Sequence, residues 1–150
     1  MKNVILISAF LCLLLACSKE DLGTVSAYLG QEIKLKEGQS ALYNSNGSEG
    51  APAIKLKVEE VRDSRCPSDV VCITYGSVEV KLSLGTMDSS YRNITMCLGD
   101  CGKGGQWVDE AVVPIGAIPY KVRLLDVTPL PKHSDQKRVT KEVQLVLERL

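Results

Sequence analysis

Thiols are the groups in this chain whose type and spacing most clearly allow chemistry, and four of them lie in its middle part: Cys66, Cys72, Cys97 and Cys101. Such thiols can bind a metal ion, exchange electrons or form disulfides. Zinc sites favour C-x2-C spacing, as does redox catalysis, whereas the spacings here are C-x5-C and C-x3-C. The spacings therefore favour structural disulfides over a metal centre or redox-active thiols.

Four cysteines permit three disulfide pairings. Pairing of neighbours, Cys66 with Cys72 and Cys97 with Cys101, requires the least search by the chain. Each bond would close a short loop and stabilise the fold by about 2 kcal/mol in the chain-entropy model. Cross-pairing would require the two loops to lie side by side in space, and it remains open as the alternative.

Other groups that could break bonds are poorly arranged for it. The only histidine, His133, lies in a charged segment beside Ser134 and Asp135. A Ser-His-Asp triad needs groups brought together from separate elements and held by packing. The acidic doublets Glu59–Glu60 and Asp109–Glu110 do not form a general acid and base by themselves, because adjacent strand residues point to opposite faces. We therefore predict no catalytic residues and no enzyme activity.

Cofactors and nucleic acid are also not expected. The glycine-rich segment Gly99–Gly105 lacks the G-x-x-x-x-G-K-[ST] order of a phosphate-binding loop. Asp63, Asp69 and Asp100 lie near the cysteines, but a calcium site needs six or more oxygen ligands, so we expect neither a metal nor a cofactor. The formal net charge is zero, and no strong field would draw the chain to nucleic acid.

Recognition is the remaining class of function, since surface loops commonly carry binding residues. Side chains of the kinds that anchor interfaces are Arg65, Pro67, Tyr75 and the single Trp107. Tyr75 and Trp107 could instead belong to the core, which is the commoner place for them. We expect a non-enzymatic module that binds a protein or a glycan; the alternative is an inhibitor of an exported hydrolase that uses the Cys66–Cys72 loop.

Short alternating runs separated by Gly, Pro, Asn and Asp predict that these residues are positioned by an all-β fold. The expected strands are Gln31–Lys36, Ser40–Tyr43, Ala53–Arg62, Ile73–Leu84, Tyr91–Leu98, Trp107–Ile115, Tyr120–Val127 and Val143–Leu147. This number of strands predicts an antiparallel two-sheet β-sandwich, immunoglobulin-like, with a small β-barrel as the alternative.

The sequence predicts irregularities at two positions in these strands. The apolar positions of Ala53–Arg62 shift by one near Glu59–Glu60, which predicts a β-bulge. Pro114 interrupts another strand and therefore suits the edge of a sheet. The segment Leu98–Gly105 is so rich in glycine that no regular structure is expected there.

The N-terminus has the features of a targeting segment. Lys2 precedes the apolar run Val4–Leu15, which is too short to span a bilayer comfortably. The run ends in the sequence L-L-A-C at Leu14–Cys17, which resembles the lipobox of bacterial lipoproteins. This resemblance implies cleavage after Ala16 and lipid attachment to Cys17; the other interpretation is an ordinary secretory signal with a chance cysteine.

The lipobox divides the chain into residues 1–16 as signal peptide, 17–28 as lipidated tether and 29–150 as β-sandwich domain. The sequence S-K-E-D at Ser18–Asp21 resembles the acidic export signal of surface lipoproteins in Bacteroidetes-type bacteria; a solvated linker is the alternative. Two or three acyl chains on Cys17 would hold the protein firmly. We therefore expect an outer-membrane lipoprotein of the cell envelope, on its periplasmic or cell-surface face.

A second resemblance covers Asp63–Leu84. This segment is similar to a motif of small exported bacterial β-proteins without an assigned activity: D-S-R-C-P, a second cysteine, an aromatic residue, a glycine and an alternating strand. The chain departs from the motif at Thr74–Gly76, where the motif has Trp-Ala-Gly. The resemblance implies a disulfide-stapled loop between two strands, and it implies no activity.

Overall fold

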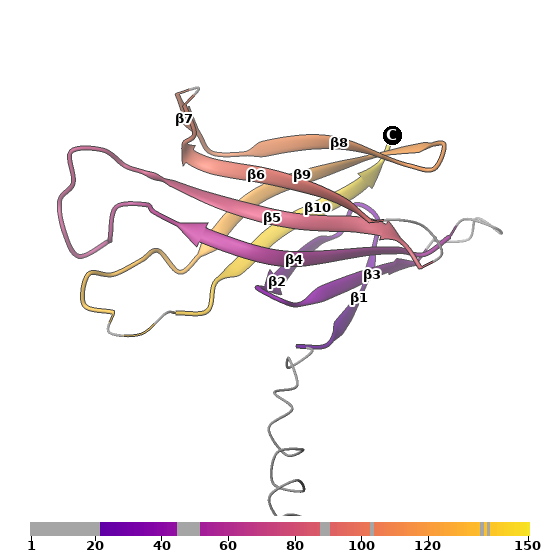
Figure 1. The fold of residues 1–150 in the computed structure, drawn as a ribbon, viewed down its shortest axis with the longest axis horizontal. Helices are drawn as coiled ribbons and strands as arrows, with labels where there is room; N and C mark the ends of the chain where they lie inside the picture. The colour runs from indigo at the N-terminus through magenta and orange to yellow at the C-terminus, as the bar shows by residue number, and fades with distance from the viewer. Residues whose placement is uncertain (1–21, 45–51, 88–90, 103, 136, 138) are drawn as a thin grey trace, which may run out of the picture.

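The computed structural model describes residues 22–44, 52–87, 91–102, 104–135, 137 and 139–150, and this part of the chain is all-β, without a helix (Figure 1). Its strands are Thr24–Tyr28 (β1), Glu32–Lys36 (β2), Ser40–Asn44 (β3), Ile54–Asp63 (β4), Ser77–Thr86 (β5), Arg92–Asp100 (β6), Gly105–Gln106 (β7), Asp109–Ile115 (β8), Ile118–Thr128 (β9) and Glu142–Arg149 (β10).

The strands form two open sheets. Sheet A has the order β1-β3-β4-β5-β6-β7, and sheet B has the order β2-β10-β9-β8. Neighbouring strands are antiparallel, except that β1 runs parallel to β3. The β-sandwich prediction is therefore confirmed, and the alternative of a closed barrel is wrong. Pro114 lies in β8, an edge strand of sheet B, as its missing N–H predicts.

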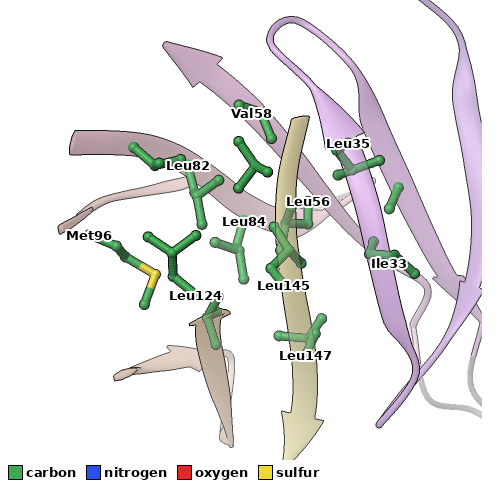
Figure 2. Close-up of a cluster of buried hydrophobic side chains, with 14 of the residues drawn as sticks. Ile33, Leu35, Leu56, Val58, Leu82, Leu84, Met96, Leu124, Leu145 and Leu147 are labelled. Carbon is green, nitrogen blue, oxygen red and sulfur yellow. The ribbon is translucent and has the colours of Figure 1, made fainter. Parts of the chain in front are cut away.

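Aliphatic side chains from the inner faces of both sheets form the core. Figure 2 shows leucines of sheet A (Leu56, Leu82, Leu84) gathered with leucines of sheet B (Leu124, Leu145, Leu147). All six are fully buried. Burial of a leucine contributes about 1.5–3 kcal/mol relative to exposure, so this core holds the two sheets together.

The predicted bulge in β4 is confirmed. The register of β4 against β5 shifts between Val58 and Glu60, so that Val58 pairs with Leu82 while Val61 pairs with Val80. Both valines are buried, with exposed fractions of 0% and 4%. An extra residue at this point therefore keeps the apolar side chains of β4 on the inner face beyond the bulge.

The ordered domain begins before Leu29. The expected tether of residues 17–28 contains strand β1, whose parallel pairing with β3 brings Thr24 opposite Ser40. The assignment of Thr24–Tyr28 to a tether is therefore wrong.

The expected signal peptide, residues 1–16, and Cys17 lie outside the described residues. From Leu22 onward, no described helix has the length and apolar character needed to cross a membrane.

Strand ends near the cysteines also differ from expectation. Strand β5 starts at Ser77 and not at Ile73, because the preceding residues belong to a loop. The glycine-rich segment is partly regular: β6 continues to Asp100, which pairs with Gly105 of β7. Strand β8 starts at Asp109, so Trp107 precedes it.

Tyr43 of β3 provides a test of the core. Its side chain is 1% exposed, burial raises the pKa of its hydroxyl, and among the described residues that hydroxyl has no hydrogen-bond partner. We predict that Tyr43→Phe raises the free energy of unfolding by up to about 1 kcal/mol, because it removes a buried polar group without breaking a bond. Urea unfolding would measure this, with the exposed Tyr28→Phe as a neutral control. A clear loss of stability would contradict the prediction.

Candidate functional site

Two long loops extend from the same end of the sandwich (Figure 1, left). One joins β4 to β5 across residues 64–76, and we call it the stapled loop. The other joins β9 to β10 across residues 129–141, and we call it the supporting loop.

The four cysteines form two disulfides. The stapled loop contains the Cys66–Cys72 disulfide, with Cα atoms 5.9 Å apart. The second disulfide is Cys97–Cys101, with Cα atoms 6.1 Å apart. Pairing of neighbouring cysteines is therefore confirmed.

A buried charge cluster holds the base of the stapled loop. Arg65 donates hydrogen bonds from Nε and Nη2 to the two carboxylate oxygens of Asp63, at 2.8 and 2.7 Å, and a further one from Nη2 to the carbonyl oxygen of Val127, at 2.8 Å. The Nζ of Lys141 lies 2.9 Å from Asp63 Oδ2 and donates to the carbonyl oxygen of Pro129, at 2.7 Å. The cluster thus joins the end of β4 in sheet A to β9 and to the residue before β10 in sheet B.

The electrostatics of the cluster favour the ionised form of Asp63. Burial alone would raise the pKa of Asp63, but hydrogen bonds from Arg65 and Lys141 outweigh burial and hold that pKa below its usual value. Burial likewise opposes the charge on Arg65, and the bonds to Asp63 raise the pKa of its guanidinium. Asp63 and Arg65 therefore remain charged and paired.

Arg65 is consequently not available to a partner. Its residue exposure is 6%, and its donors are directed to Asp63 and to the carbonyl oxygen of Val127. The expectation that Arg65 anchors an interface is wrong, because its guanidinium is used inside the fold. Pro67 is half-buried, next to the disulfide.

The supporting loop holds the stapled loop at a second place. The carboxylate of Asp69 accepts hydrogen bonds from the backbone N–H groups of His133, at 2.6 Å, and of Ser134, at 3.1 Å. The N–H of Ser68 donates to the carbonyl oxygen of Pro131, at 2.9 Å. His133 and Ser134 thus contribute backbone amides to a loop contact.

Two glycines allow the close approach at the base of the stapled loop. Gly76 has a φ of +76°, and a Cβ there would lie 2.2 Å from the carbonyl oxygen of Ser64. Gly99 has a φ of +93°, and a Cβ there would lie 2.5 Å from the carbonyl oxygen of Gly76. Any larger residue would clash with backbone, so glycine is required where the loop closes.

Apolar side chains at the far part of the stapled loop point to solvent. Val71 is 100% exposed and Ile73 is 105% exposed, relative to their reference values, and Val70 is 40% exposed. We call these three residues the apolar tip. Since the loop is fixed by a disulfide, by Asp69 and by its glycine closure, the apolar tip is presented in one arrangement.

An aromatic pair joins the stapled loop to the short segment between β7 and β8. The rings of Tyr75 and Trp107 meet edge to face, with centroids 5.3 Å apart and an interplanar angle of 64°. Tyr75 is 42% exposed and Trp107 is 67% exposed. They belong to the surface and not to the core, so both are accessible to a partner.

The acidic doublets serve separate structural contacts. Glu59 accepts from Ser83 Oγ at 2.7 Å, whereas Glu60 pairs with Lys81 at 2.7 Å. Asp109 accepts the N–H of Cys97 at 2.9 Å, whereas Glu110 pairs with Arg123 at 2.9 Å. The described residues contain no group of three or more His, Cys, Asp or Glu side chains arranged to hold a metal ion.

Several residues of the site were missed by sequence reasoning. Asp63 and Asp69 were considered only as calcium ligands, and Lys141 was not considered at all. The spacing D-S-R at Asp63–Arg65 contains a signal, since alternate strand residues share a face and a carboxylate matches a guanidinium.

Comparison with known proteins adds no relative: no protein-family model, no curated protein and no solved structure matches the chain. Function therefore has to be inferred from the chemistry of the stapled loop and of the surfaces around it.

Removal of the Asp63 carboxylate tests the charge cluster. In Asp63→Ala, two cations with exposed side-chain fractions of 5% (Arg65) and 11% (Lys141) lose their shared partner. We expect a loss of about 3 kcal/mol in the free energy of unfolding, as is typical when one partner of a buried pair is removed. Chemical denaturation measures it. The control Glu110→Ala, in an exposed ion pair, should lose less than about 1 kcal/mol; equal losses would contradict a special role for Asp63.

Acid should release the contact between the two loops. The N–H groups of His133 and Ser134 hold the pKa of Asp69 below its usual value. The contact is therefore fully present above the unfolded pKa, about 3.9, and is lost as the pH falls through the lower folded value. The amide resonances of His133 and Ser134, followed by NMR against pH, should titrate below about pH 3.9. Asp69→Asn should abolish this step, and a midpoint above that value would contradict the assignment.

Proposed function

We propose that this protein is a non-enzymatic binding module of the cell envelope, attached through lipid on Cys17, that recognises a folded protein partner with its stapled loop. The observation that carries the proposal is the full exposure of Val71 and Ile73 on a loop that is closed by the Cys66–Cys72 disulfide and held by Asp69 against the supporting loop. The partner expected from this chemistry is a protein with an apolar cleft.

Binding through the apolar tip would gain free energy from burial and lose little to ordering. Single exposed apolar residues are normal, but two fully exposed β-branched side chains separated by a single residue offer a concentrated gain on burial, about 1.5–3 kcal/mol each. β-Branched side chains have few rotamers, and a stapled loop has little freedom to lose, so the ordering cost of binding is small. Tyr75 and Trp107 add amphipathic rings of the kind that dominate interface energies.

Two independent features support the proposed location in the cell envelope. Disulfides persist in oxidising compartments outside the cytosol, and the chain forms two of them. The lipobox resemblance at Leu14–Cys17 supports a lipid anchor. A tethered protein at a membrane would meet its partner at raised effective concentration, so a modest affinity of the stapled loop would suffice.

Inhibition of an exported hydrolase is the second candidate. The stapled loop protrudes from the end of the sandwich and carries its exposed side chains on a disulfide-closed segment, which suits insertion into an active-site cleft. In that case the partner would be an enzyme, and binding would suppress its activity.

The test replaces the apolar tip. A photo-crosslinking residue at Ile73 would identify the partner in native membranes, and the purified partner would then be titrated with wild-type protein and with the double variant Val71→Ser, Ile73→Ser. We expect at least about tenfold weaker binding by the double variant, because two apolar anchors are removed. Val112→Ser, which changes a valine that is 58% exposed on β8, is the matched control and should bind like wild type.

Three outcomes would change the assignment of the stapled loop. Equal affinity of the double variant and the wild type would reject the stapled loop as the binding surface. Crosslinks to lipid alone would instead identify the apolar tip as a membrane contact. Loss of enzymatic activity of the captured partner in the presence of wild-type protein would favour the inhibitor over the simple binding module.

A further inference from the structure

The outer face of sheet A contains a trough that follows strand β5. The outward residues of β5 include Ser83 and Gly85, which are small, and also Lys81, which is long. On β4, Lys57 pairs with Ser83 and Lys55 pairs with Gly85, and on β6 Asn93 pairs with Ser83. The two small residues beside these longer side chains leave a hollow in the sheet surface.

The hollow consists of two cavities that share residues. The first, of about 310 Å³, is lined by Lys55, Lys57, Glu59, Ser83, Tyr91 and Asn93. The second, of about 370 Å³, is lined by Glu59, Lys81, Leu82, Asn93, Ile94 and Thr95. Because both are lined by Glu59 and Asn93, they adjoin each other, and we call them together the outer trough. Its floor from Gly85 to Lys81 spans about 13 Å at the usual rise of a strand.

The walls of the outer trough are rich in hydrogen-bonding groups, and two of its three lysines are paired with carboxylates. Lys57 Nζ lies 2.7 Å from Glu59 Oε2, and Ser83 Oγ donates to Glu59 Oε1, also at 2.7 Å. Lys81 Nζ lies 2.7 Å from Glu60 Oε2. These bonds orient the side chains in advance and neutralise most of the lysine charge. The surface therefore suits an uncharged ligand with many hydroxyl groups better than a strongly anionic one.

Tyr91 supplies a flat surface at one end of the outer trough. A Cβ placed on Gly85 would lie 3.0 Å from Tyr91 Cδ1 and 3.2 Å from Tyr91 Cγ, so the tyrosine side chain lies against this glycine. Tyr91 is nevertheless 46% exposed. An aromatic ring supported by the sheet on one side can pack against an apolar ligand face on the other.

We propose that the outer trough is a second binding site, separate from the stapled loop, and that it takes a short stretch of a neutral oligosaccharide. The C–H face of one sugar packs on Tyr91, and the hydroxyl groups of the next sugars bond to Asn93, Glu59 and Lys57. A sugar chain is the class of ligand that combines an apolar ring face with hydroxyls along its edge, which matches one ring followed by donors and acceptors. A protein partner would find few apolar side chains to bury here.

The experiment titrates the isotope-labelled full chain with cellohexaose, xylohexaose, maltohexaose and mannohexaose, and with trigalacturonate as an acidic comparison, by NMR. We expect saturable shifts of the Ser83, Tyr91 and Asn93 amides with at least one neutral probe. Tyr91→Ala and, independently, Asn93→Ala should each weaken that binding at least fivefold. Tyr28→Ala, at a tyrosine that is 58% exposed on β1, should leave it unchanged.

Three results would overturn the proposal: no saturable shift with any neutral hexasaccharide at 10 mM, binding only of trigalacturonate, or shifts confined to residues 64–76. Asn93→Ala tests the same site independently of Tyr91→Ala, in case the tyrosine variant fails to fold. Asn93 is exposed, so this substitution should leave the fold intact. The amide spectrum of each variant would show whether it is folded. Failure here would leave the stapled loop untouched, since the two surfaces share no residue.

Discussion

The carboxylate of Asp63, shared between Arg65 and Lys141, is the constraint on which the end of the molecule with the two long loops depends. It is the point where sheet A, the base of the stapled loop and the start of β10 in sheet B are joined by direct bonds. Charges removed from water are tolerated only when they are paired and hydrogen-bonded. The direction in which the stapled loop leaves β4 is therefore fixed by electrostatics as well as by packing.

The core and the stapled loop are held by different kinds of interaction in this fold. The aliphatic core holds the two sheets together without any contribution from the apolar tip, whose residues Val71 and Ile73 are fully exposed. The stapled loop is held by a disulfide, by Asp69 and by backbone hydrogen bonds. Because polar and covalent bonds fix the loop, its apolar side chains remain available for a partner.

Most of the fold could be predicted from local pattern, and the failures have physical causes. Alternation identified the buried strands, and the short spacings identified both disulfides. Ile73 begins a run of good strand formers, but the closure at Gly76 removes these residues from the sheet. Strand β1 was missed because only Ala27 of its five residues is buried and its partner β3 is not its neighbour in the sequence. The pairing of Asp63 depends partly on Lys141, far along the chain, which no local pattern reveals.

The bulge in β4 connects these features. Side chains alternate along a strand, so one extra residue reverses the faces of everything that follows. Without the shift between Val58 and Glu60, Asp63 would point to solvent; with it, Asp63 pairs with the buried Val78 and its side chain is 6% exposed. The same extra residue allows Glu59 to bond Ser83 while Glu60 bonds Lys81. A single irregularity thus places the carboxylate of Asp63 at the base of the stapled loop and the two carboxylates that pair with Lys57 and Lys81 in the outer trough.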